Sequence, residues 1–357
     1  MKRGAGTSGA GGRVPRRRRR VAAGAVAVAA VIGGAYAAAT AAAGTPAGHP
    51  GQTAADGHSP SPSPRHTPPR RLPFGTIGRY AVAGRSFVLV DRSRVKTAGI
   101  RVLHTFVRYP VIPASAAAGG PLARGLFPLL VFAPGYIQCD SSYGALLNSW
   151  ASAGYVVAAV EFPRTNCHLR DPDEADLVNQ PGDVSFVISQ MTAMSDQQRG
   201  VLPGLINPAQ IAVAGQSDGG DTVVAVAANT CCADHRVKAA LILSGAQWPP
   251  LGGSWFPKRT PPILFVQGDA DTINPPAASL QMYQADRAGP RFYLDLFGAT
   301  HLPPYEGHRP PEPTVARVTT AFLDRYVAGQ LPAAAVMTRA GHVPGLADLV
   351  SGGRLPP

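Results

Sequence analysis

Ser217 is the residue whose neighbours most clearly indicate chemistry, because it stands in the pentapeptide Gly215-Gln216-Ser217-Asp218-Gly219. The mostly apolar run 210–214 precedes this Gly-x-Ser-x-Gly motif, and the helix-like stretch 221–229 follows it. A sharp strand-to-helix turn strains the serine, and glycines without Cβ atoms let strand and helix pass closely. The pentapeptide alone arises by chance in a chain with 40 glycines, so this context makes Ser217 the predicted nucleophile.

A serine hydroxyl becomes a good nucleophile only when a base accepts its proton and an acid orients that base. Three histidines, His301, His308 and His342, follow the two candidate acids, Asp269 and Asp271. Only His301 comes directly after a strand-like run, residues 292–297. This position predicts His301 as the base. The alternative interpretation is that His301 is an ordinary histidine of a surface loop.

Two aspartates compete for the role of the acid. Asp269 and Asp271 both follow the buried-strand pattern of residues 262–267. Either one could instead cap a helix expected to begin near Pro275. On these residues alone the choice between the two stays open.

Acyl transfer also needs hydrogen-bond donors directed at the developing oxyanion. One expected donor is the backbone N–H of Asp218, which follows the nucleophile, and the other is the N–H of Tyr136. Tyr136 follows the apolar run 127–132 through a turn at Gly135. Its ring is expected to form a wall of the substrate pocket, or else to be a half-exposed loop aromatic.

From about residue 74 to 330 the chain resembles the bacterial cutinase and polyester-hydrolase group, the platelet-activating-factor acetylhydrolases and the plant chlorophyllases. All are α/β-hydrolases that act on carboxylic esters. The matching pieces are Pro134-Gly135-Tyr136, Ala153-Gly154-Tyr155-Val156-Val157, the Ser217 motif, Asp271-Thr272-Ile273-Asn274-Pro275 and Gly298-Ala299-Thr300-His301.

The resemblance implies Asp271, rather than Asp269, as the acid. It also implies that Trp248 flanks the ester, although Trp248 could equally cap the core beneath a loop. Cutinase-like members commonly carry Met after the serine and His or Trp before it, where this chain has Asp218 and Gln216. A carboxylate beside the oxyanion is unfavourable, so we expect Asp218 to turn away, onto a helix N-terminus.

The expected fold class is α/β, in the form of the α/β-hydrolase fold. Strands around 86–90 and 100–109 precede alternating strands and helices, which end with a helix near 313–328. This alternation predicts a mostly parallel sheet with antiparallel N-terminal strands and helices on both faces. Residues 74–330 are thus expected to be the catalytic domain, and residues 331–357, rich in Ala, Gly and Pro, a loose C-terminal tail.

The formal net charge of +12 is concentrated near the start of the chain. Residues 1–73 contain eleven basic residues and one acid, whereas the remainder contains 22 basic and 20 acidic residues. A nearly neutral body lacks a general electrostatic footprint for nucleic acid, so no nucleic-acid partner is expected.

The N-terminal region has the composition of an export segment. Arg16–Arg20 precede an apolar run from Val21 to about Ala43 that ends in small residues. Residues 1–43 are therefore expected to be an export signal or, since the run could span a bilayer, a membrane anchor. Residues 44–73, rich in Pro and Ser, predict a disordered linker. The protein is thus expected to be secreted or anchored facing the exterior.

Four cysteines fit an oxidising compartment. Cys139 and Cys167 follow neighbouring strands, so a bridge between them is geometrically reasonable. Cys231 and Cys232 could form a vicinal bridge, pair elsewhere or stay reduced.

No metal and no cofactor are expected, because the chain has no Cys-x-x-Cys or His-x-x-x-His spacing. An acidic loop is the one feature that could hold calcium, and we interpret it as a solvated loop. Its acids are Asp171, Asp173, Glu174 and Asp176.

These patterns together predict a secreted serine hydrolase that cleaves small-molecule or lipid-like carboxylic esters through an acyl-enzyme. Ser217 would be the nucleophile, His301 the base and Asp271 the acid. A serine peptidase or acyltransferase could use the same three residues, because fold and triad do not fix the acceptor. A catalytically silent, tethered binding protein is the alternative outside enzymes.

Overall fold

The computed structural model describes residues 77–111, 125–196, 202–307 and 310–352. All of them belong to one compact unit, Thr67–Pro357. The expected export signal and linker lie outside the described residues. In the part of the chain that is described, no helix is long and apolar enough to cross a membrane.

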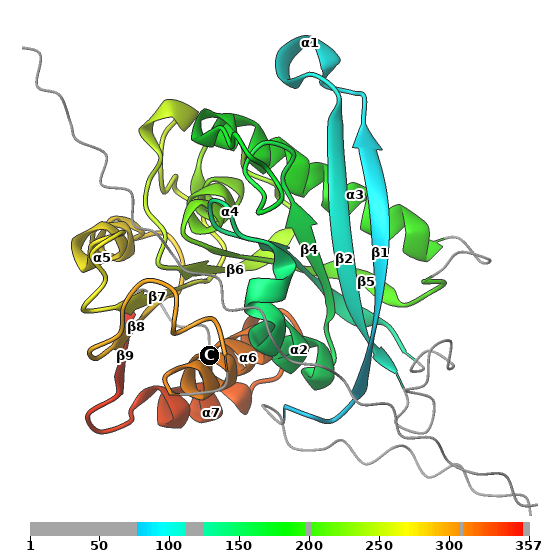
Figure 1. The fold of residues 1–357 in the computed structure, drawn as a ribbon. Coiled ribbons are helices and arrows are strands. Elements are labelled where there is room, and N and C mark those ends of the chain that lie inside the picture. Colours follow the sequence, from blue (N-terminus) through cyan, green and yellow to red (C-terminus); the bar gives the residue numbers. More distant parts are fainter. Residues whose placement is uncertain (1–76, 112–124, 197–201, 308–309, 353–357) are drawn as a thin grey trace, which may run out of the picture. The chain divides into compact units, whose positions relative to one another are not determined.

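One nine-stranded sheet organises the described residues, in the order β1-β2-β4-β3-β5-β6-β7-β8-β9 (Figure 1). The strands are β1 (Ala81–Asp91), β2 (Arg101–Val111), β3 (Phe127–Ala133), β4 (Val156–Glu161), β5 (Ile206–Gln216), β6 (Val237–Leu243), β7 (Ile263–Gly268), β8 (Arg291–Leu296) and β9 (Ala347–Gly352). Six central strands run parallel, namely β4, β3, β5, β6, β7 and β8, whereas β1, β2 and β9 pair antiparallel with their neighbours.

The strand sequences explain this arrangement. β3 is apolar, β7 is apolar except for Gln267, and both are buried along their whole length, as parallel strands covered on both faces require. β1 alternates more and is largely exposed, as an antiparallel edge strand tolerates. The predicted mostly parallel sheet with antiparallel N-terminal strands is confirmed.

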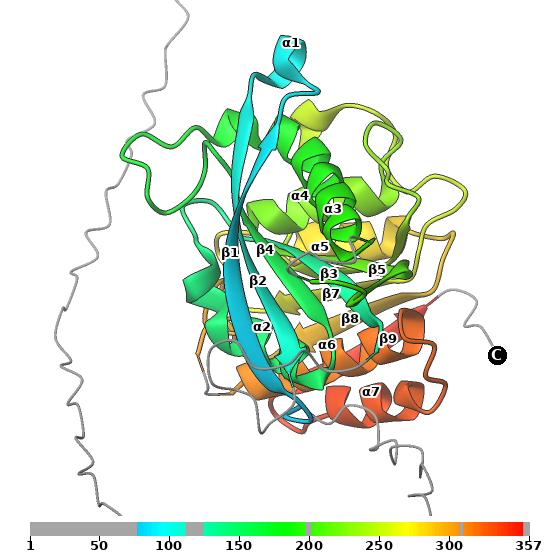
Figure 2. The same ribbon diagram turned by 90° about the vertical axis from the view of Figure 1, so that its right-hand side faces the viewer.

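Helices cover both faces of the sheet (Figure 2). They are α1 (Val95–Ala98), α2 (Gly144–Ala153), α3 (Gln180–Asp196), α4 (Asp218–Ala228), α5 (Pro276–Ala285), α6 (Glu312–Tyr326) and α7 (Ala333–Gly341), with short 3-10 turns η2 (Asp140–Tyr143), η3 (Glu174–Asn179) and η4 (Pro249–Leu251). The core on one face includes Val187 of α3, Val223 of α4 and Met282 of α5. The core on the other includes Trp150 of α2 and Phe322 of α6.

The parallel strands end at a common edge. Ala133 of β3 lies opposite Gly215 of β5, Gln216 lies opposite Leu243 of β6, and Leu243 lies opposite Val266 of β7. The loops that follow these carboxyl ends carry the predicted site residues. In open α/β sheets, ligands bind at this edge.

The expectation of a loose tail from residue 331 is wrong for residues 333–352. Helix α7 buries Ala333, Met337 and Gly341 at a spacing of four residues, and β9 pairs with β8 along the edge of the sheet. Alanine is the best helix former, so an Ala-rich composition did not argue against a helix there. β9 buries only Ala347 and Leu349, which explains its weak signal in the sequence.

Candidate active site

Ser217 occupies a strained turn between β5 and α4, with φ 54° and ψ −125°. Two glycines make the turn possible. A Cβ on Gly215 would lie 2.1 Å from the Gly219 carbonyl oxygen, and one on Gly219 would lie 1.9 Å from the Ala133 carbonyl oxygen. No larger residue fits at either position, so this strand–turn–helix presents the serine in the conformation of a nucleophile elbow.

The structure brings Ser217, His301 and Asp271 into one hydrogen-bonded line. His301 Nε2 lies 2.8 Å from Ser217 Oγ, and His301 Nδ1 lies 2.7 Å from Asp271 Oδ2. A carboxylate only accepts, so Nδ1 carries the proton and Nε2 is free to accept from the serine hydroxyl. Asp271 is 3% and His301 6% exposed, which keeps water from competing for these bonds.

Backbone and side-chain donors hold the Asp271 carboxylate in place. Its Oδ1 accepts the N–H groups of Ile273 and Asn274, at 2.9 and 3.0 Å. Its Oδ2 also accepts from Gln267 Nε2 at 3.0 Å. Asp269 is exposed instead and accepts the Gly298 N–H at 2.6 Å, so it lies outside the line to His301.

Gln216 and Tyr143 connect His301 to the loop after β3, a connection that the sequence did not predict. Gln216 Nε2 donates to the His301 carbonyl oxygen at 3.3 Å. Gln216 Oε1 accepts the Tyr143 hydroxyl at 2.8 Å, and that hydroxyl accepts the Gly135 N–H at 3.2 Å. Both side chains are fully buried. No sequence motif marks Tyr143, which ends the polar turn η2, with sequence Asp-Ser-Ser-Tyr.

The loop after β3 packs directly against Ser217. A Cβ on Gly135 would approach Ser217 Cβ to 3.1 Å. The amides of Tyr136 and Asp218, the two expected oxyanion donors, have no acceptor among the loop and turn backbone hydrogen bonds of the described residues. The half-buried Tyr136 ring reaches the next loop, where its hydroxyl donates to the Pro172 carbonyl oxygen at 3.1 Å.

Trp248 is half-buried in the loop after β6. This loop begins against the elbow helix, because a Cβ on Gly245 would lie 3.0 Å from Gly220. The Ala246 N–H donates to the buried carboxylate of Asp221 in α4. Among the described residues, the buried Trp248 Nε1 has no hydrogen-bond partner.

Asp218 does not cap the helix as expected. It is 8% exposed, and its Oδ2 is buried without a partner in the described part of the chain. Asp221, also in the first turn of α4, does accept a backbone N–H, but its donor is Ala246 in the loop after β6. Burial, followed by the charge of Glu174, raises the pKa of Asp218 to about 7. The side chain is thus kept where its ionisation is costly.

A disulfide joins Cys139 to Cys167, with the two Cα atoms 5.4 Å apart. The predicted bridge is therefore present, and it ties the loop after β3 to the loop after β4. Cys231 and Cys232 are bonded to each other, which is the vicinal alternative among those left open.

Protein partners occupy two of the four loop acids considered for calcium. Asp176 forms a buried ion pair with Arg101, N–O 2.6 Å, and Asp173 accepts the Ala175 N–H at the start of η3. In the described ranges, the group with metal-ligand geometry is Cys139, Cys167 and His168. Its two sulfurs form the disulfide, so they are not thiolate ligands.

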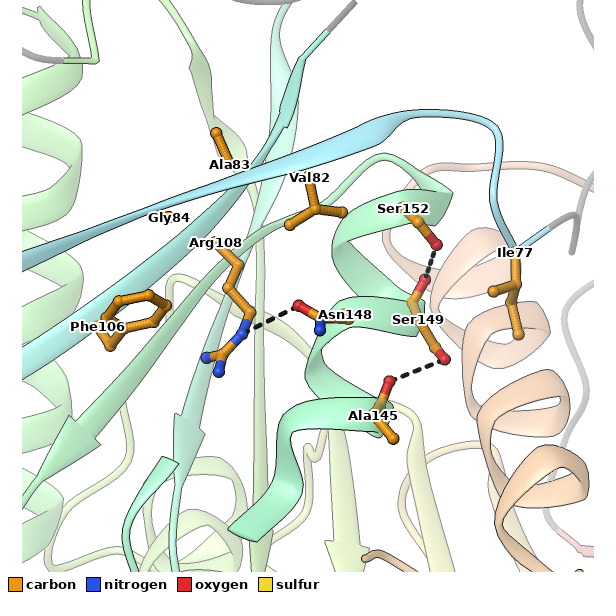
Figure 3. Close-up of a pocket in the computed structure, with 10 residues that line it drawn as sticks. All are labelled: Ile77, Val82, Ala83, Gly84, Phe106, Arg108, Ala145, Asn148, Ser149 and Ser152. Carbon is orange, nitrogen blue, oxygen red and sulfur yellow. Dashed lines mark hydrogen bonds between the residues drawn. The ribbon is translucent and has the colours of Figure 1, made fainter. Parts of the chain in front are cut away.

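A cavity of about 570 Å³ lies away from these residues, between β1, β2 and α2 (Figure 3). Arg108, Phe106 and Asn148 line it, and none of its lining residues belongs to the predicted site. This cavity is therefore separate from Ser217, His301 and Asp271.

The sheet order, the elbow at the end of β5 and the line of Ser217, His301 and Asp271 define an α/β-hydrolase. Residues 121–333 match the PETase family model, described as PET hydrolase-like, and the chain belongs to this family. The resemblance to α/β-hydrolase serine esterases is thereby confirmed.

Two curated relatives carry names of ester hydrolases. The chain is 28% identical over 205 residues to bis(hydroxyethyl) terephthalate hydrolase of Streptomyces coelicolor (strain ATCC BAA-471 / A3(2) / M145), covering 57% of this chain and 58% of the relative. It is 29% identical over 210 residues to cutinase est1 of Thermobifida alba, covering 58% and 63%. The chain thus spans about three fifths of the length of these relatives.

Proposed function

We propose that this protein is a serine hydrolase that cleaves carboxylic esters through an acyl-enzyme. The observation that carries the proposal is the hydrogen-bonded line from Ser217 Oγ through His301 to Asp271. Membership of the PET hydrolase-like family and the names of the two relatives support the ester as the bond that is cleaved.

In the first half of the reaction, Ser217 Oγ attacks the ester carbonyl while His301 Nε2 takes its proton. Asp271 stabilises the imidazolium that forms, because its carboxylate accepts a hydrogen bond from the Nδ1–H group. The N–H groups of Tyr136 and Asp218 stabilise the oxyanion of the tetrahedral intermediate. His301 then donates its proton to the leaving alcohol, and the acyl group remains on Ser217.

In the second half, His301 takes a proton from water, which attacks the acyl-enzyme through a second tetrahedral intermediate. Collapse of that intermediate returns the proton to Ser217 and releases the carboxylic acid. The Gln216–Tyr143–Gly135 connection supports both halves, because it fixes the loop that presents the Tyr136 N–H.

The substrates we propose are small-molecule or lipid-like esters. Tyr136 and Trp248 lie on loops beside the elbow, where aromatic rings supply apolar walls for an acyl or alcohol group. No cofactor or metal takes part in this scheme.

We also propose that the protein works outside the cytoplasm, secreted or tethered through its N-terminal segment. The basic and apolar composition of residues 1–43 and the two disulfides support this location.

Labelling with a fluorophosphonate probe tests the proposal, since only an activated serine reacts rapidly. We expect one probe per chain, attached to Ser217, and no labelling of Ser217→Ala or His301→Ala. The exposed residue His342, which pairs with Asp348, offers a matched histidine control, and His342→Ala should label normally. Failure of the folded wild-type protein to label would contradict an activated nucleophile.

A further inference from the structure

The carboxylate that follows the nucleophile is unusual, because it is buried and one of its oxygens has no protein partner. Asp218 is 8% exposed, and its Oδ2 finds no hydrogen bond within the described residues. Buried carboxylates are normally paired, so an unpaired one beside a reaction centre calls for a partner that the protein itself does not supply.

Both chain neighbours of Asp218 pack against the loop after β3, because a Cβ on Gly135 would lie 3.1 Å from Ser217 Cβ and one on Gly219 would lie 1.9 Å from the Ala133 carbonyl oxygen. Burial and the charges of Glu174 and Asp218 raise the pKa of Tyr136, and Asp218 also acts on the buried hydroxyl of Tyr143. Tyr143 holds the Gly135 N–H, and a Cβ on Gly135 would touch Ser217. Asp218 therefore lies close to the loop that faces the reacting ester.

A second carboxylate reinforces this negative site. Glu174 opens η3, and the Tyr136 hydroxyl binds the Pro172 carbonyl oxygen two residues earlier in the chain. The charge of Glu174 acts on both Tyr136 and Asp218. Among the salt bridges of the described residues, none involves Asp218 or Glu174.

We propose that Asp218, together with Glu174 and the Tyr136 ring, makes this site selective for esters that carry a cation, either a quaternary ammonium or a protonated amine. This inference rests on the proposed ester hydrolysis and adds a substrate class to it. Bis(hydroxyethyl) terephthalate, the ester in the name of one relative, is neutral and does not require such a group.

The physical argument has two parts. A substrate cation supplies the missing partner of the Asp218 carboxylate, and an aromatic face such as that of Tyr136 attracts the same cation. The bound cation also offsets the repulsion between Asp218 and the developing oxyanion, which an uncharged substrate leaves in place. Both parts favour a cationic ester in kcat/KM over a neutral ester of the same shape.

The test compares two pairs of isosteric esters with the full-length protein, at low ionic strength and about pH 8, where Asp218 is ionised. One pair is butyrylcholine and its analogue with a quaternary carbon in place of the ammonium nitrogen, which places the cation in the alcohol. The other is the p-nitrophenyl ester of γ-butyrobetaine and its carbon analogue, which places the cation in the acyl group.

We expect the cationic member of at least one pair to have a kcat/KM about tenfold higher than its neutral partner. Asp218→Asn keeps the backbone N–H and should bring this ratio close to one. Glu174→Gln should lower it about two- to threefold. Asp196→Asn removes one negative charge at the far end of α3 and should leave the ratio unchanged.

A ratio of one or less in both pairs of the wild-type protein would overturn the inference, while turnover of the neutral esters would leave ester hydrolysis standing. A high ratio that survives Asp218→Asn would also overturn it. If Asp218→Asn does not fold by circular dichroism, an unchanged ratio in Glu174→Gln overturns it instead. No turnover of any of the four esters by a folded protein would remove the proposed function and this inference with it.

Discussion

The side-chain oxygen of Gln216, the residue directly before Ser217, accepts a hydrogen bond from the Tyr143 hydroxyl at 2.8 Å. The same hydroxyl accepts a hydrogen bond from the Gly135 N–H, so one buried phenol joins the turn at Ser217 to the loop after β3. This relationship indicates that the elbow and the loop are positioned as a unit.

Tyr143→Phe should therefore impair catalysis more than binding. Loss of the hydroxyl frees the Gly135 amide and leaves Gln216 Oε1 without this donor, so we expect kcat to fall about tenfold with little change in KM. Steady-state kinetics with p-nitrophenyl butyrate measures this split. Tyr305 offers a matched control, because its buried hydroxyl binds Ser244 and the Val266 carbonyl instead. A similar loss of kcat in Tyr305→Phe would argue for a general packing effect.

Asp271→Asn should lower kcat by about a thousandfold or more, because the amide no longer fixes the protonated Nδ1 of His301. Asp269→Asn should stay within about twofold of the wild type, since Asp269 is exposed and binds the Gly298 amide rather than His301. Hydrolysis of the same ester by both variants distinguishes them. The reverse order of effects would move the acid to Asp269.

The stability of Asp218→Asn relative to the wild type should increase as the pH rises. Folded Asp218 keeps its proton up to about pH 7, whereas in the unfolded chain it ionises near pH 4. The folded state thus binds more protons between these values, and the wild type loses stability across this window. We expect the free energy of unfolding of Asp218→Asn, relative to the wild type, to be about 2–3 kcal/mol higher at pH 8 than at pH 5. Urea unfolding at pH 5 and pH 8 measures this change. The same difference in free energy of unfolding between variant and wild type at both pH values would refute the prediction.

The Cys139–Cys167 bridge closes a loop with a separation of 28 residues. Replacing both cysteines with Ser should therefore lower the free energy of unfolding by about 3–4 kcal/mol. The Cys231–Cys232 bridge joins adjacent residues and restricts the unfolded chain far less. Ser at both of those positions should therefore cost much less. Urea unfolding compares the two double variants, and equal losses would contradict the loop-closure argument.

Much of the site could be predicted from the sequence because its signals are local. The glycines around Ser217, the strand before Asp271 and the strand before His301 each mark a carboxyl end, and the topology brings those ends to one edge. The contribution of Tyr143 could not be predicted, because its partners Gly135 and Gln216 depend on how two loops pack.

Two further features could not be predicted for the same reason: the unpaired carboxylate of Asp218, and the folding of residues 333–352 into α7 and β9. Whether a carboxylate finds a donor depends on neighbours from other elements, and here the Ala246 amide goes to Asp221. Helix α7 and strand β9 gain their stability from packing on α6 and pairing with β8, which their own short sequences do not reveal.

Kinetics of Ser217→Ala test the central claim most directly. The change removes one oxygen from a partly exposed residue, so the melting temperature and circular dichroism should match those of the wild type. We predict that turnover of p-nitrophenyl butyrate falls by at least about a thousandfold. Turnover close to that of the wild type in a folded Ser217→Ala protein would contradict the account.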